Sequence, residues 1–113
     1  MRVIKAFGFS LDGLRAAFGD EAAFREVVLM ALVGVPLALW LSLSPLATVL
    51  IVFTHVLTLV VELLNTGIEA AIDRIGPEIH AESKKAKDCG SAAQLVMLVW
   101  LVALWGMALA GRI

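Results

Sequence analysis

The sequence predicts an all-α membrane protein with three transmembrane helices and one amphipathic helix at the membrane surface. Three hydrophobic runs approach the length of about 20 residues that a helix needs to cross a bilayer. Of the 113 residues, 61% are hydrophobic and the mean hydropathy is +0.96, whereas a soluble domain has about 45–50% apolar residues. Eight of the nine basic residues lie before the first run or between the last two.

The first predicted element is an amphipathic helix over residues 2–18. One of its sides is apolar and the other carries the charges. The apolar side consists of Val3, Phe7, Leu11, Leu14 and Phe18. Such a helix can lie in the membrane interface with its basic side chains toward anionic headgroups. We expect Gly19 to end it, Asp20 to cap the next helix, and Glu21 to lie in the first turn of that helix.

Three membrane spans follow in the prediction. They cover residues 27–43, 46–64 and 91–109. Pro36 interrupts the first span, which a membrane helix tolerates where neighbours satisfy the freed carbonyl group. A turn at Ser44–Pro45 separates the first two spans, and the second continues as a polar helix until Gly76–Pro77. Residues 78–90 are predicted to be a charged connection, and the whole chain, 1–113, is predicted to form one domain.

The distribution of Lys and Arg predicts the orientation in the bilayer. The turn at residues 42–45 has none, whereas segments 1–25 and 74–87 have four each. Because cytoplasmic loops carry the excess of basic residues, we expect both segments on the cytoplasmic side of the membrane. The pattern does not indicate binding to nucleic acid, which requires a continuous basic surface.

A face of three acids and one amide follows the second hydrophobic run. Glu62, Asn65, Glu69 and Asp73 are spaced by three, four and four residues, which places them within about 80° of a helix circumference. A carboxylate so close to hydrocarbon is costly and indicates a functional site. Oxygen ligands without thiolate or imidazole suit Mg²⁺, which typically binds one or two carboxylates together with substrate phosphates.

Two further polar groups are predicted to meet this face at the cytoplasmic surface. They are Asp20 and Glu21 with Arg25, and Lys84, Lys85 and Lys87 with Asp88. Lysines would neutralise phosphates, and a carboxylate could take the proton of an attacking hydroxyl, so these residues suit phosphoryl transfer. The alternative is that the acids and bases only pair with each other. No Gly-rich phosphate loop is present, which argues against a soluble kinase or P-loop ATPase. For His55 we expect a hydrogen bond between packed helices.

The segment ELLNTGIEAAIDRI at 62–75 resembles the signature of the prokaryotic integral-membrane diacylglycerol kinases, E-x-x-N-[ST]-x-I-E-x-x-x-D. DEAAFRE at 20–26, KDCGSAA at 87–93 and GFSLDGLRAAF at 8–18 are also similar to that family. The resemblance covers nearly the whole chain in the same order. It implies a homotrimeric bundle with three transmembrane helices and a surface helix per subunit. It also implies transfer of the γ-phosphate of MgATP to a lipid hydroxyl.

The resemblance also implies roles for individual residues. Glu62 would be the general base, and Glu21 and Glu69 would hold the Mg²⁺ that accompanies ATP. The matching positions that would bind nucleotide or phosphate are Arg2, Ser10, Asn65, Asp73, Glu78, His80, Lys87 and Asp88. Arg15 and Ser91 would support binding of the substrate.

Two branches of this family differ in their lipid substrate. KDCGSAA is more similar to the branch that phosphorylates diacylglycerol, whereas the branch that phosphorylates undecaprenol tends to have AAGA at this place. We therefore expect ATP-dependent conversion of diacylglycerol to phosphatidic acid at the cytoplasmic surface. The alternatives are an undecaprenol kinase and a small membrane protein without enzymatic activity.

Overall fold

The computed structural model describes all 113 residues. It contains four helices and no strands. The helices are α1 (Arg2–Asp20), α2 (Ala22–Trp40), α3 (Pro45–Ile75) and α4 (Ala81–Leu109). Helices α2, α3 and α4 are long and apolar enough to cross a membrane. The predicted all-α fold is therefore confirmed.

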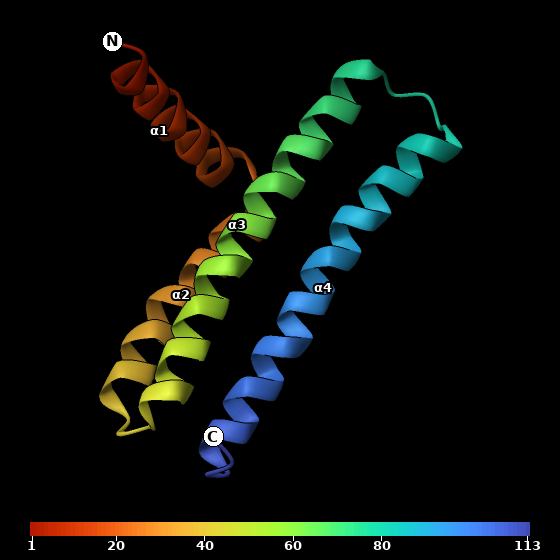
Figure 1. Cartoon of the computed structure of the whole chain (residues 1–113). Helices are drawn as coiled ribbons and strands as arrows, with labels where there is room; N and C mark the ends of the chain where they lie inside the picture. The colour runs from red at the N-terminus through yellow and green to blue at the C-terminus, as the bar shows by residue number, and fades with distance from the viewer.

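Helix α3 is the centre of the arrangement, because α2 and α4 both pack along it (Figure 1). The C-terminus lies near the α2–α3 turn, and the α3–α4 connection is at the opposite end. Helix α1 diverges from this bundle, and its N-terminal end projects away from α3. Helices α2, α3 and α4 thus form one bundle, with α1 to one side.

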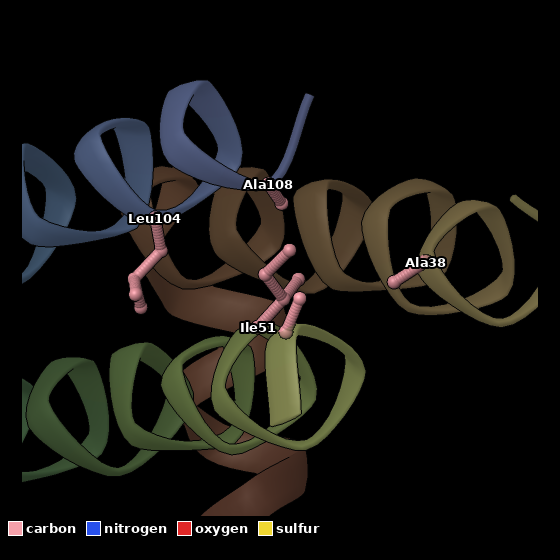
Figure 2. Close-up of a cluster of buried hydrophobic side chains, with 5 residues drawn as sticks. Ala38, Ile51, Leu104 and Ala108 are labelled. Atoms are coloured by element: carbon pink, nitrogen blue, oxygen red, sulfur yellow. The ribbon is translucent and has the colours of Figure 1, made fainter. Parts of the chain in front are cut away.

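Three alanines, one isoleucine and one leucine pack the three long helices together near the α2–α3 turn. The buried cluster consists of Ala38, Ala47, Ile51, Leu104 and Ala108. Figure 2 shows Ala38, Ile51, Leu104 and Ala108 of this cluster pointing into the space between α2, α3 and α4. Alanines at such contacts let helix backbones approach closely, which favours packing in a membrane. This end of the bundle contains no charged residue in its core.

The α2–α3 turn follows the prediction for Ser44–Pro45. Ser44 caps α3, because its Oγ accepts a hydrogen bond of 3.0 Å from the Ala47 amide. Proline suits the first helical position, where its missing N–H is not needed. Helix α2 nevertheless ends at Trp40, so residues 41–43 of the predicted first span are not helical. Ser44 is extended, as the residue before a proline tends to be, and the chain therefore leaves the helix before it.

Three predictions about the junction of α1 and α2, those for Gly19, Asp20 and Glu21, are wrong. Asp20 is the last residue of α1, and Glu21 is the N-cap of α2 without a capping bond from its side chain. Arg25 explains this register, because its Nη1 donates hydrogen bonds to the carbonyl oxygens of Phe18 (2.7 Å) and Gly19 (3.1 Å). Satisfying these carbonyl groups lets α1 continue past Gly19.

The predicted charged connection over residues 78–90 is also wrong, because α4 begins at Ala81. His80 caps the helix, since its Nδ1 accepts a hydrogen bond of 3.1 Å from the Glu82 amide. Two ion pairs, each between residues about one helical turn apart, then stabilise the first turns of α4. They are Lys85 with Glu82 at 3.8 Å and Lys84 with Asp88 at 2.5 Å. A charged segment can therefore extend a membrane helix beyond the apolar run.

Candidate active site

Glu62 lies between α3 and α4 and is 5% exposed. Its Oε2 accepts a hydrogen bond of 2.9 Å from Nε2 of Gln94 on α4. The same Nε2 donates to the carbonyl oxygen of Thr58, also at 2.9 Å. The other carboxylate oxygen, Oε1, accepts no hydrogen bond within the chain. It is not fully buried, unlike the Oδ1 of Asn65. One oxygen of a buried carboxylate is therefore held, and the other is available.

Asn65 lies one turn beyond Glu62 and is 8% exposed. It packs against Gly90 of α4, where an added Cβ would collide with its Oδ1. That Oδ1 is buried and has no hydrogen-bond partner in the chain. Gly90 therefore allows α3 and α4 to approach closely at the edge of the site, and Asn65 offers an unused acceptor there.

A pocket of about 290 Å³ lies where α3 connects to α4. We call it the charged pocket, after the six charged or ionisable residues that line it: Asp73, Glu78, His80, Lys84, Lys87 and Asp88. Five of these six are residues that the sequence predicts to bind nucleotide or phosphate. The structure thus gathers one part of the predicted site at one end of the molecule.

Lysine side chains in the charged pocket are paired with acids. Lys87 Nζ lies 2.8 Å from Asp73 Oδ1, and Lys84 Nζ lies 2.5 Å from Asp88 Oδ2. The hydrogen bond that Lys87 donates to Asp73, together with the negative charges of Asp73 and Glu69, raises the pKa of Lys87 above its usual value. Lys87 therefore stays positively charged at neutral pH and can attract phosphate.

Glu69 and Glu21, the predicted metal ligands, make no ion pair or hydrogen bond through their side chains. Glu69 lies on α3 between Asn65 and Asp73, and its negative charge contributes to the raised pKa of Lys87. Glu21 lies at the junction of α1 and α2. No three carboxylate, imidazole or thiol side chains come together in the chain. The structure thus places the two predicted metal ligands on different elements.

Helix α1 does not carry its predicted site residues into the charged pocket. Arg2 is exposed near the end that projects away from α3 (Figure 1). Arg15 pairs with Asp12 on its own helix at 3.5 Å. Ser10 lines an open groove of about 530 Å³ between α1 and α3, and its Oγ donates to the carbonyl oxygen of Ala6 at 3.0 Å. Within one chain, these three residues are separate from the contacts of α3 with α4.

On α4, the predicted residue Ser91 makes no hydrogen bond to Glu62, whereas Gln94 does. Ser91 is exposed and makes no side-chain hydrogen bond. Gln94, one turn further along, is buried and contacts Glu62, but the sequence analysis did not select it. The available signal was that Gln94 is the only amide side chain in the hydrophobic run over residues 91–109.

His55 has the packing role that the sequence predicts. Trp105 Nε1 of α4 donates a hydrogen bond of 3.3 Å to His55 Nε2. The ring also lies against Gly34 of α2, where a Cβ would collide with it. His55 therefore joins α2, α3 and α4 two turns away from Glu62.

Comparisons with known proteins agree with the motifs. The family described as prokaryotic diacylglycerol kinase matches residues 8–109. A diacylglycerol kinase of Escherichia coli strain K12 is 45% identical over 109 residues, which cover 92% of this chain and 89% of that protein. Its counterpart in Pseudomonas aeruginosa is 46% identical over 110 residues (97% and 89%), and that in Haemophilus influenzae is 36% identical over 104 residues (92% and 88%). With its three membrane-length helices, this chain is a bacterial membrane protein that belongs to the prokaryotic diacylglycerol kinase family.

Proposed function

We propose that this protein transfers the γ-phosphate of ATP to the hydroxyl group of diacylglycerol and so forms phosphatidic acid. The observation that carries the proposal is the geometry of Glu62, a buried carboxylate with one held and one available oxygen. It lies where the apolar part of α3 gives way to its polar part. A lipid hydroxyl from the bilayer and a phosphate from water could meet at this depth.

The reaction needs a base and a neutralised phosphate. The lipid hydroxyl oxygen attacks the γ-phosphorus, a new O–P bond forms, and the bond to the bridging oxygen of ADP breaks. Glu62 takes the hydroxyl proton on Oε1, its available oxygen. Lys87 would balance negative charge on the phosphates, and Asp73 would hold Lys87 in place. The charged pocket is small for a whole nucleotide, since ligand sites usually measure roughly 300–1,000 Å³. It suits the phosphate chain.

Residues around the charged pocket would share the binding of ATP. Asn65 offers a buried Oδ1 without a partner, and Glu78, His80 and Asp88 line the charged pocket. Glu69 and Glu21 are the residues that would hold Mg²⁺, because both carboxylates are free of other partners. Mg²⁺ typically binds one or two carboxylates plus substrate phosphates, and it would withdraw negative charge from those phosphates.

A homotrimer would supply the residues that one chain keeps apart. Helix α1 diverges from the bundle in Figure 1, and its N-terminal part could reach the α3–α4 site of a neighbouring subunit. Arg2, Ser10 and Arg15 would then assist binding at that site, together with Ser91. We further propose that residues 1–113 form one kinase domain in the bacterial inner membrane. The basic segments, and with them the charged pocket, would face the cytoplasm and its ATP.

The relatives' names favour diacylglycerol over undecaprenol and over a role without enzymatic activity. To test this, the purified protein is assayed in mixed micelles with MgATP and either dioleoylglycerol or undecaprenol. We expect kcat/KM for dioleoylglycerol to be higher by at least about tenfold, which corresponds to ~1.4 kcal/mol. A preference for undecaprenol would move the protein to the other branch. Inactivity toward both lipids would overturn the kinase proposal.

A further inference from the structure

Gln94 is a buried polar residue in an otherwise apolar stretch of α4. It is 7% exposed, whereas the next residues, Leu95 and Val96, are 62% and 67% exposed. A buried amide is costly unless it is hydrogen-bonded, so a leucine would be the simpler choice at such a position. The role of Gln94 must therefore be sought in what it contacts.

The contacts of Gln94 define the orientation of its amide group. Nε2 is 2.9 Å from the carbonyl oxygen of Thr58, an atom that can only accept a hydrogen bond. The nitrogen, not the oxygen, must therefore face α3. One N–H anchors the amide to the α3 backbone, and the second N–H is directed at Glu62 Oε2, also at 2.9 Å.

We propose that Gln94 is a positioning residue that holds the Glu62 carboxylate by Oε2 and leaves Oε1 to accept the proton of the lipid hydroxyl. This inference rests on the proposed function of Glu62 as the base. Because an N–H already occupies Oε2, a proton is best accepted on the other oxygen. No other hydrogen bond holds the Glu62 side chain, whose rotations are otherwise restrained only by packing.

The first test replaces Gln94 by Met, which has a similar length but no amide. We expect Gln94→Met to lower kcat roughly tenfold with dioleoylglycerol, the scale of one lost hydrogen bond to a charged group. KM for MgATP should stay unchanged, because Gln94 lies outside the charged pocket. Gln94→Asn withdraws the amide by one methylene group and should show a similar loss in kcat. A native kcat in both variants overturns the proposal.

Trp105→Phe is the matched control. It removes the other side-chain hydrogen bond between α3 and α4 within the apolar runs, 11 residues or about 16 Å further along α4. If Gln94 only joins the helices, the two substitutions should lower kcat alike. We expect Trp105→Phe to keep native kcat while lowering the unfolding temperature in micelles. An equal loss of kcat in Trp105→Phe and Gln94→Met contradicts positioning.

A double variant separates positioning from packing even if Gln94→Met is less stable. If Gln94 acts through the Glu62 carboxylate, Gln94→Met should not lower the residual kcat of Glu62→Gln any further. A similar tenfold loss in both backgrounds assigns Gln94 to packing. Glu62→Gln also tests the underlying function separately. A loss of turnover in Glu62→Gln with native kcat in Gln94→Met refutes this inference alone, whereas native turnover in Glu62→Gln refutes the base assignment and positioning with it.

Discussion

Polar side chains of α3 contact polar side chains of α4 in two regions, and the side chains of the two regions differ in their exposure to solvent. At the Glu62–Gln94 contact, both side chains belong to residues less than 10% exposed, and one amide supplies the only hydrogen bond to the carboxylate. In the charged pocket, the side chains of Lys87 and Asp73 pair while remaining 42% and 69% exposed.

This difference determines what a substitution does. Water can replace a lost partner in the charged pocket, and salt screens its ion pairs, so the fold depends little on them. Water is less able to replace a partner at Glu62, because the residue is only 5% exposed. We therefore expect changes at Glu62 to affect the chemical step and changes in the charged pocket to affect nucleotide binding.

The largest expected effect is that of Glu62→Gln. The substitution keeps the shape and polarity of the side chain but removes its ability to take a proton. We expect kcat to fall by about 10²–10⁴, the usual range for general acid–base catalysis, while MgATP still binds. Turnover in mixed micelles and equilibrium binding of MgATP measure the two quantities.

Glu69→Gln is the matched comparison, two helical turns along the same face of α3. It should weaken MgATP binding as well as turnover, because Glu69 is proposed to hold the metal ion. Unchanged affinity for MgATP in Glu69→Gln would contradict the metal role. Native turnover in Glu62→Gln would contradict the assignment of the Glu62–Gln94 contact to the chemical step.

The second expected effect concerns Gly90, which lies between the two regions. A methyl group there collides with Asn65, so Gly90→Ala should destabilise the packing of α3 and α4 by about 1–3 kcal/mol. It should also reduce turnover, because Asn65 would move. Gly106→Ala is the control on the same helix, where nothing lies within 4 Å of the added Cβ. The unfolding temperatures of the two variants are compared in micelles. Equal unfolding temperatures would contradict this expectation.

The sequence predicted the helices well where periodicity and caps determine them. The Ser44–Pro45 turn and the continuous α3 ending before Gly76 are examples. It failed at residues 81–90, because high charge was interpreted as a loop although ion pairs one turn apart stabilise a helix there. It grouped the acids of α3 by helical spacing alone. Gln94 was missed because its partner, Glu62, is 32 residues away, and spacing within one helix does not reveal contacts between helices.

The smallest expected effect on the fold is that of Lys87→Met in the charged pocket. Its ion pair with Asp73 is exposed, so the unfolding temperature should change little. KM for MgATP should nevertheless rise roughly tenfold, the scale of one lost charged hydrogen bond to phosphate. Lys85→Met is the control, because Lys85 pairs with Glu82 outside this pocket and should keep native KM.

The pH dependence of this pair follows from the raised pKa of Lys87, which Asp73 and Glu69 cause. A group whose pKa is raised on folding stabilises the folded state below its unfolded value of 10.5 and loses that contribution as pH rises through the folded value. The difference in unfolding temperature between the native protein and Lys87→Met should therefore be constant from about pH 7 to about pH 9.5. The rise in KM should be constant over the same range, because Lys87 remains charged throughout. A difference in KM that disappears by about pH 9 would contradict the raised pKa, because it would show that the Lys87 ammonium group loses its proton well below 10.5.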